Sequence, residues 1–159
     1  MSEPVTLLDG RVTLYLGDCR DVMASFPPCF RVDAVVSDPP YGVNYEGSVT
    51  KHSRNGHAYL SFDDTPENIA AICVPAIRQA VSISRSAIVT PGNANAFKYD
   101  EPRSLGAIYY PSGANSGPWG FVCSQPLFYY GKDPYLMKAL GRLPNAFSTT
   151  EATDRSINH

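Results

Sequence analysis

The sequence predicts an α/β fold with a mostly parallel sheet, and three observations lead to this fold class. Two short apolar runs, 34–37 and 86–90, have the composition of buried strands. An amphipathic helical pattern lies between them, over 65–81. Strand, helix and strand in this order are typical of a right-handed parallel crossover. Because 159 residues can bury the core of one domain but not comfortably of two, we expect a single domain over 1–159.

The segment before the first run predicts one more strand and a short helix. Residues 11–16 combine β-branched and aromatic side chains, as strands do. Asp18 can then cap a helix that runs from Cys19 to about Phe26, where two prolines follow.

The helix between the two runs has a clear start. Thr65 is suited to the cap, Pro66 to the first helical position and Glu67 to the first turn. Its apolar residues recur at helical spacing and predict one core face: Ile69, Ile72, Cys73, Ala76, Ile77, Ala80 and Val81. Pro75 interrupts the pattern and predicts a kink.

The second half of the chain is rich in loops. We expect strands over 105–110 and 125–130, the second as an edge strand or a hairpin arm. Trp119 stands in a loop of small residues, where we expect it to pack against the body of the protein. The turn over 91–95 should emerge beside Tyr41, because the carboxyl ends of parallel strands share one edge of a sheet.

Composition narrows the function classes. The formal charge of −2 argues mildly against a strongly basic nucleic-acid binder. The four cysteines are not paired at metal-ligand spacing, and we expect reduced thiols in a cytoplasmic protein. His52 and His57 stand five residues apart without an acidic or thiol partner, so we expect no metal. No apolar run is long enough to span a membrane.

The most informative stretch is Asp38-Pro39-Pro40-Tyr41, directly after the first apolar run. The two prolines fix their own φ angles and restrict the residue before each of them. A carboxylate, rigid backbone carbonyls and an aromatic ring then stand where ligands bind in open α/β sheets. Such a platform suits a planar group with an amino substituent. The simpler interpretation is a turn after a strand, and the sequence around the motif favours the binding site.

Four segments in order carry a resemblance to a known family. They are Gly17-Asp18-Cys19, Asp33 to Gly42, Ala87 to Gly92, and Gln125 to Lys132. This order resembles the amino-group DNA methyltransferases, which methylate N6 of adenine or N4 of cytosine, in the branch where the catalytic half comes first. The resemblance implies a partial Rossmann-like fold, S-adenosylmethionine as methyl donor, double-stranded DNA as partner, and a bacterial or phage-type protein.

The resemblance also implies roles for individual residues. The target base is flipped out of the duplex and stacks on Tyr41. Asp38 and a backbone carbonyl of Pro39 or Pro40 accept hydrogen bonds from the exocyclic amino group. Asp18 lies near the adenine of the methyl donor, although a helix cap alone also explains it. Aspartate at the first motif position favours adenine over cytosine.

A long polar loop over 43–64 follows the motif. Lys51 and Arg54 belong to its densest basic cluster. Contact with DNA phosphates and a solvated loop are equally good interpretations of these two residues.

One expected part of the family pattern does not occur in the sequence. The glycine-rich loop that binds the donor's methionine end, Asp-Pro-Phe followed by Gly-Ser-Gly, is absent from it. We therefore expect an incomplete catalytic domain that resembles the N-terminal half of such an enzyme and works with a second chain or a further segment. The alternatives are a non-catalytic module for DNA binding or assembly, and an RNA or protein methyltransferase with a related motif.

Overall fold

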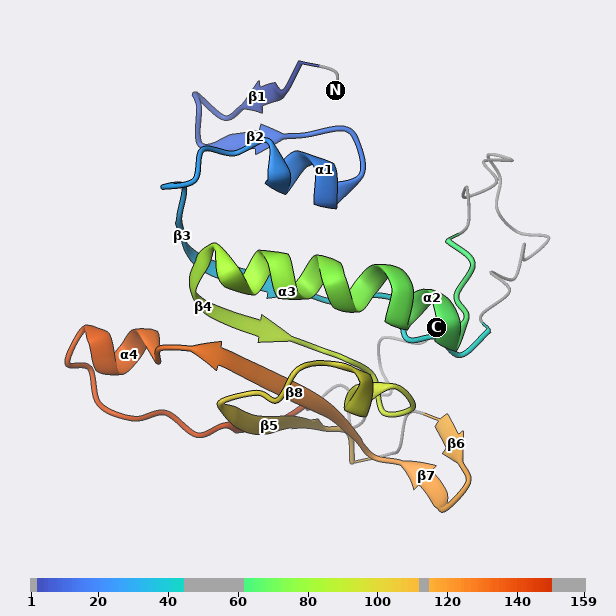
Figure 1. Ribbon diagram of the computed structural model, residues 1–159. Helices are drawn as coiled ribbons and strands as arrows, with labels where there is room; N and C mark the ends of the chain where they lie inside the picture. The colour runs from blue at the N-terminus through green and yellow to red at the C-terminus, as the bar shows by residue number, and fades with distance from the viewer. Residues whose placement is uncertain (1–2, 45–61, 112–114, 150–159) are drawn as a thin grey trace, which may run out of the picture.

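The computed structural model describes residues 3–44, 62–111 and 115–149. The fold is mixed α/β (Figure 1), and its centre is a five-stranded sheet in the order β3-β4-β8-β5-β9. The bounds of these strands are β3 (Val32–Ser37), β4 (Ser84–Val89), β5 (Ser104–Tyr109), β8 (Ser124–Gly131) and β9 (Ala146–Ser148).

The pairing confirms the predicted crossover but not a mostly parallel sheet. β3 and β4 are parallel, as the strand–helix–strand pattern predicts. β8 is antiparallel to both β4 and β5, while β5 and β9 are parallel. The segment between β5 and β8 forms a hairpin of β6 (Asn115–Gly117) and β7 (Gly120–Val122) instead of a crossover helix. Without such a helix, the chain returns antiparallel, and the sheet is therefore mixed.

The N-terminal segment lies outside this sheet. β1 (Val5–Leu7) and β2 (Val12–Leu14) form a separate antiparallel hairpin, followed by α1 (Cys19–Ala24). The predicted strand over 11–16 is thus confirmed only in its middle. In Figure 1 the hairpin and α1 lie on the far side of α3 from the sheet. A hydrogen bond from the Gln79 side chain to the Arg20 carbonyl, 3.1 Å, joins the two parts.

The predicted helix is confirmed, with a change of helix type before Pro75. It consists of α2 (Pro66–Asn68), the π-helical turn η1 (Ile69–Cys73) and α3 (Val74–Ser82). Thr65 caps it by accepting a hydrogen bond from the Asn68 backbone at 3.2 Å. The Val74 N–H bonds to the Ile69 carbonyl, five residues back. Because an α-helix has no room for a proline ring against the carbonyl four residues earlier, the wider turn relieves the clash that Pro75 would cause.

The core lies between this helix and one face of the sheet. Its buried members come from the helix, from β4 and β8, and from the segment around the 3₁₀ turn η2 (Ala96–Lys98). They are Ile69, Cys73, Val74, Ile77, Val89, Ala96, Tyr99 and Phe128. The predicted core face of the helix is therefore confirmed.

Two expectations about the second half are wrong. β8 is a central strand and not an edge strand. Pro126 is tolerated there because β4 pairs only with the later part of β8, residues 128–131, so the missing N–H faces no partner strand. Trp119 is fully exposed instead of packed, since it lies in the tight turn between β6 and β7.

Candidate functional site

The Asp38–Tyr41 motif lies at the carboxyl ends of β3 and β4, as the sequence predicts. Asp38 follows directly after β3, and the Thr90 backbone N–H bonds to the Ser37 carbonyl at 3.1 Å. Since β8 runs antiparallel, its first residues arrive at the same edge of the sheet. Asp38 is exposed, and Tyr41 is half-buried behind it.

A chain of side-chain hydrogen bonds orients the carboxylate. The Tyr41 hydroxyl donates to Asp38 Oδ1 at 2.6 Å, and the Thr90 hydroxyl donates to the same oxygen. The Gln125 amide donates to the Tyr41 hydroxyl. The Tyr110 hydroxyl donates to Gln125 Oε1 at 2.9 Å. Segments far apart in sequence thus meet at one carboxylate, and its orientation depends on all of them.

The backbone after Tyr41 is equally well determined. Asn95 is buried and donates through Nδ2 to the carbonyls of Tyr41, at 2.7 Å, and Gly42, at 3.2 Å. The Asp64 carboxylate accepts from the backbone N–H groups of Gly42, at 2.6 Å, and Val43, at 3.1 Å. Gly42 has a φ of +66°, and a β-carbon there would lie 2.6 Å from the Ile69 side chain. Only glycine fits this position without movement of its neighbours.

The predicted neighbour of Tyr41 is confirmed. Gly92, in the turn after β4, lies against the ring, and a β-carbon on it would be 2.8 Å from the ring atoms Cγ and Cδ1. The two turns therefore pack face to face. The Tyr41 ring cannot shift toward the body of the protein, because the Gly92 backbone occupies that space.

The electrostatics fix the direction of the Tyr41 hydrogen bond. Burial, followed by the hydrogen bond to Asp38 and the charge of that carboxylate, raises the pKa of Tyr41 from 10.0 to about 12. At neutral pH the phenol keeps its proton and donates it to Asp38. Among the described residues the donors to this carboxylate all bond to Oδ1. Oδ2 can accept a hydrogen bond from an N–H group of a ligand.

Asp18, the other predicted ligand residue, lies elsewhere in a local structure. Its carboxylate accepts from the Arg20 backbone at 2.9 Å and pairs with the Arg20 guanidinium at 2.6 Å. These hydrogen bonds, together with the guanidinium charge, lower the pKa of Asp18 to about 2. The interactions of the described residues do not connect Asp18 with Asp38. Asp18 thus has the predicted role of helix cap, and the structure does not bring the two carboxylates together.

Other predicted residues have different outcomes. Pro39 is half-buried and Pro40 exposed, both within the motif turn. Lys51 and Arg54, predicted as DNA contacts, lie outside the described residues, as do the two histidines of the same loop.

Sequence reasoning missed four residues of the site. Thr90 follows directly after β4, so its place at the strand end was a usable signal. Asp64 closes the polar loop, but nothing in the sequence pairs it with a backbone 21 or 22 positions away. Gln125 and Tyr110 come to this edge only because β8 is antiparallel to β4 and β5, which the sequence did not predict.

Comparison with known proteins assigns no family. No protein-family model matches the chain, and no curated protein matches it. In the described part of the chain, no three or more His, Cys, Asp and Glu side chains are grouped to bind a metal ion. Over the same residues, the helices are all too short or too polar to cross a membrane.

Proposed function

We propose that this chain provides the target-base site of an amino-group DNA methyltransferase. Its substrate would be a flipped base in double-stranded DNA, with N6 of adenine favoured over N4 of cytosine, and its methyl donor would be S-adenosylmethionine. One observation carries the proposal. The carboxylate of Asp38 is oriented at the strand edge by two hydroxyl donors on Oδ1, beside the ring of Tyr41 and with Oδ2 available to a ligand.

This arrangement suits an exocyclic amino group. Asp38 would accept one of its N–H groups through Oδ2, and a backbone carbonyl of Pro39 or Pro40 would accept the other. The Tyr41 ring would stack on the face of the base, as aromatic side chains do with flipped bases. Two acceptors fix the plane of the amino group and leave the nitrogen lone pair free to react, which is catalysis by positioning.

The methyl donor fits this chain less well. S-adenosylmethionine would supply the methyl group, yet the glycine-rich donor loop of the family pattern does not occur in the sequence. Asp18, the other residue assigned to the donor, pairs with Arg20 and is not connected to Asp38. We therefore place the donor on a further segment or a second chain, and derive no step from donor contacts here.

The chain alone should accordingly bind S-adenosylmethionine weakly or not at all. Isothermal titration calorimetry measures this affinity directly. Binding in the micromolar range would contradict the assignment of the donor site to another segment.

A non-catalytic module for DNA binding or assembly is the second candidate, and the absent donor loop favours it. The two functions differ in the fate of DNA. The test combines the chain with the donor-binding half of an enzyme of this branch, radiolabelled S-adenosylmethionine and unmethylated genomic DNA. We expect label in N6-methyladenine after digestion to nucleosides and chromatography.

Two variants assign the activity to the site. Asp38→Ala should lower the rate by about 10²-fold or more, the usual loss when one positioned hydrogen-bonding group is removed. Asp33→Asn is the matched control, because Asp33 is an exposed carboxylate on the same strand and should leave the rate unchanged. Equal rates for Asp38→Ala and the unmodified chain would refute the role of Asp38. Absence of methylated base in every combination would establish the non-catalytic alternative.

A further inference from the structure

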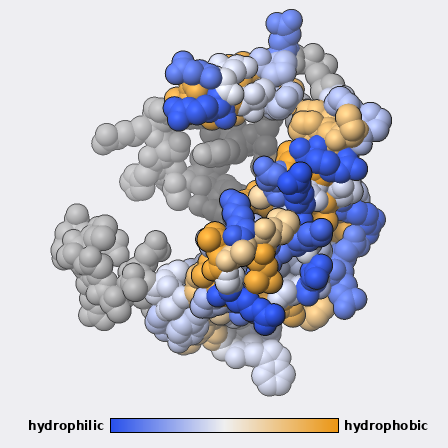
Figure 2. Space-filling view, turned by 90° about the vertical axis from the view of Figure 1, so that its left-hand side faces the viewer, coloured by the Kyte–Doolittle hydropathy of each residue, from blue (hydrophilic) through white to orange (hydrophobic). Residues whose placement is uncertain are grey.

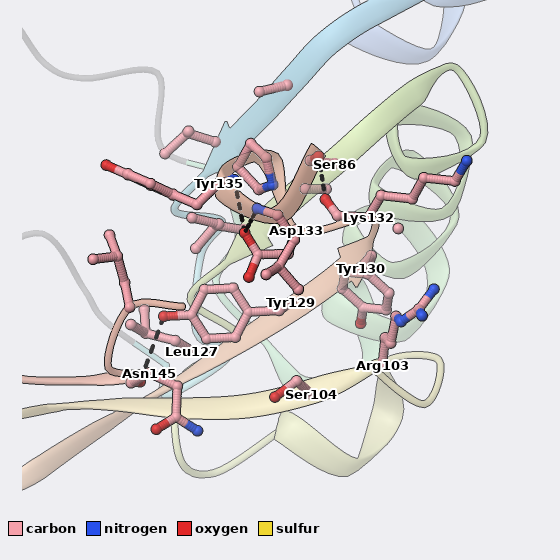
Figure 3. Close-up of a pocket in the computed structure, with 18 of the residues that line it drawn as sticks. Ser86, Arg103, Ser104, Leu127, Tyr129, Tyr130, Lys132, Asp133, Tyr135 and Asn145 are labelled. Atoms are coloured by element: carbon pink, nitrogen blue, oxygen red, sulfur yellow. Dashed lines mark hydrogen bonds between the residues drawn. The ribbon is translucent and has the colours of Figure 1, made fainter. Parts of the chain in front are cut away.

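The face of the sheet opposite α3 contains a large open cavity. Its volume is about 510 Å³ (Figure 3). The floor is apolar and comes from three neighbouring strands, with Val36 of β3, Ile88 of β4 and Leu127 of β8. The short helix α4 (Pro134–Met137) and the segment 142–147 form its wall. Figure 3 shows the Tyr129 ring in the middle of the cavity, with its hydroxyl directed to Asn145.

The two faces of the sheet differ in how well they are covered. On the α3 face, Val89 and Phe128 are 0% and 6% exposed. On the cavity face, Val36 is 82% exposed and Phe147 is 51% exposed. At the α4 end, which faces the viewer in Figure 2, hydrophobic residues also gather at the surface with hydrophilic residues around them. Contiguous apolar surface of this kind marks an interaction site, and parallel strands are normally covered on both faces.

The border of the cavity is positively charged. Arg103, Lys132 and Arg142 contribute to its lining and are exposed. None of their side chains has a hydrogen-bond or ion-pair partner among the described residues. The one carboxylate of the lining, Asp133, instead accepts from the backbone N–H groups of Tyr135, at 2.8 Å, and Leu136, at 3.3 Å, as the cap of α4. The cavity therefore combines an apolar floor with an unpaired cationic border.

We propose that this cavity binds an amphipathic α-helix whose apolar face is flanked by acidic residues. A helix packed on a sheet is the standard second layer of an α/β domain, and its apolar stripe would cover the floor. Glutamate or aspartate along its sides would pair with the cationic border and set its orientation. A small molecule fits less well, since its sites enclose most of the ligand, whereas Val36 on this floor is open to solvent.

A second copy of this chain also fits less well among the described helices. The long helix α3 already uses its apolar face for the core, and it carries Arg78 on its exposed side. That charge would repel the cationic border. The partner is therefore a helix of another segment or protein, with acidic residues on its flanks.

Two synthetic peptides test this proposal with the whole chain. One is an amphipathic helical peptide with leucines on one face and glutamates on both flanks, and the other has lysine in place of every glutamate. Fluorescence anisotropy of the labelled peptides measures their affinities. We expect the glutamate peptide to bind at least about tenfold more tightly, which two or three surface ion pairs can supply.

Variants locate the binding surface. The double variant Arg103→Glu with Lys132→Glu should reverse the preference between the two peptides. The matched control is Arg11→Glu with Arg31→Glu, which changes the net charge equally at the N-terminal end of the molecule and should keep the preference. Val36→Lys should abolish binding of the glutamate peptide, and because this side chain is exposed the substitution should not disturb folding, which circular dichroism checks.

Three outcomes would overturn the proposal. Equal affinity for the two peptides, or no binding of either, would exclude an acid-flanked helix. A concentration-dependent dimer in sedimentation, lost in Val36→Lys, would show that a second copy occupies the face. Helix binding does not involve Asp38, so Asp38→Ala should keep the peptide affinity whatever its effect on methyl transfer.

Discussion

Asp18 and Asp38 make an instructive comparison, because both are carboxylates that follow a strand and both were predicted to lie at a ligand site. Asp18 bonds only within its own turn in the described structure, to Arg20 two positions later. Asp38 accepts from Thr90, 52 positions later, and from Tyr41, which itself bonds to Gln125, 84 positions later.

The difference separates a local structural role from a candidate binding role. A cap such as Asp18 requires only its own helix turn. The geometry at Asp38 exists only when β3, β4 and β8 are assembled, because each contributes a neighbouring segment. Substitutions around Asp38 should therefore report on the assembled sheet edge, and substitutions at Asp18 on one helix end.

The largest effect on stability should come from Gly92→Ala. The β-carbon would lie 2.8 Å from the Tyr41 ring, at a φ of +70°. Positive φ costs alanine about 1–2 kcal/mol, and overpacking adds about 1–3 kcal/mol. Gly10→Ala in the N-terminal hairpin is the control, with a φ of +84° and nothing within 4 Å of the β-carbon. Urea denaturation should show a clearly greater loss for Gly92→Ala, and equal losses would contradict the close packing on Tyr41.

The next effect should come from Asn95→Ala. This buried amide satisfies two backbone carbonyls of the motif turn. Leaving buried acceptors without a partner costs about 1–3 kcal/mol. Asn93→Ala removes an exposed amide that bonds to the Ser124 carbonyl at 3.0 Å and should cost less. A smaller loss for Asn95→Ala than for Asn93→Ala, measured by thermal unfolding, would contradict this role.

A more moderate change is expected in the ionisation of Tyr41. Asp38→Asn removes the negative charge beside the phenol, so the pKa of Tyr41 should fall from about 12 while burial keeps it above 10.0. Phenolate absorbance during a pH titration measures this, with Tyr41→Phe subtracted to isolate one tyrosine. Asp18→Asn should not move the transition. An unchanged Tyr41 titration in Asp38→Asn would mean that the two side chains do not interact.

The smallest effect should follow Asp18→Asn. Asparagine can still cap α1, so only the pairing of the carboxylate with Arg20 is lost. Since folding lowers the pKa of Asp18 from 3.8 to about 2, its contribution to stability is present above pH 3.8 and is lost as the pH falls through about 2. The small difference in melting temperature between the variant and the unmodified chain should vanish over that range. A difference that persists at lower pH would assign the effect to something other than the charge.

Much of the fold was predictable from particular residues. The Thr65 cap, the apolar period from Ile69 to Ala80 and the apolar runs of β3 and β4 each state their structure locally. The fully exposed Trp119 was not predictable from its type, because large aromatic residues usually pack and only the hairpin turn places this one outside.

The candidate site divides in the same way. Its first half, Asp38 to Gly42, was readable because two prolines and a glycine restrict the backbone wherever the motif occurs. Its second half, with Thr90, Asn95, Gln125 and Tyr110, depends on which strand edges meet.

The sequence by itself thus determined the elements, the helix cap at Asp18 and the chemical character of the Asp38 motif, because these follow from residues only a few positions apart. The tertiary structure alone decided the antiparallel course of β8, the hydrogen bonds that orient Asp38 and the uncovered face of the sheet. The physical reason is that strand direction and long-range side-chain bonds follow from how whole elements pack together, which no local pattern records.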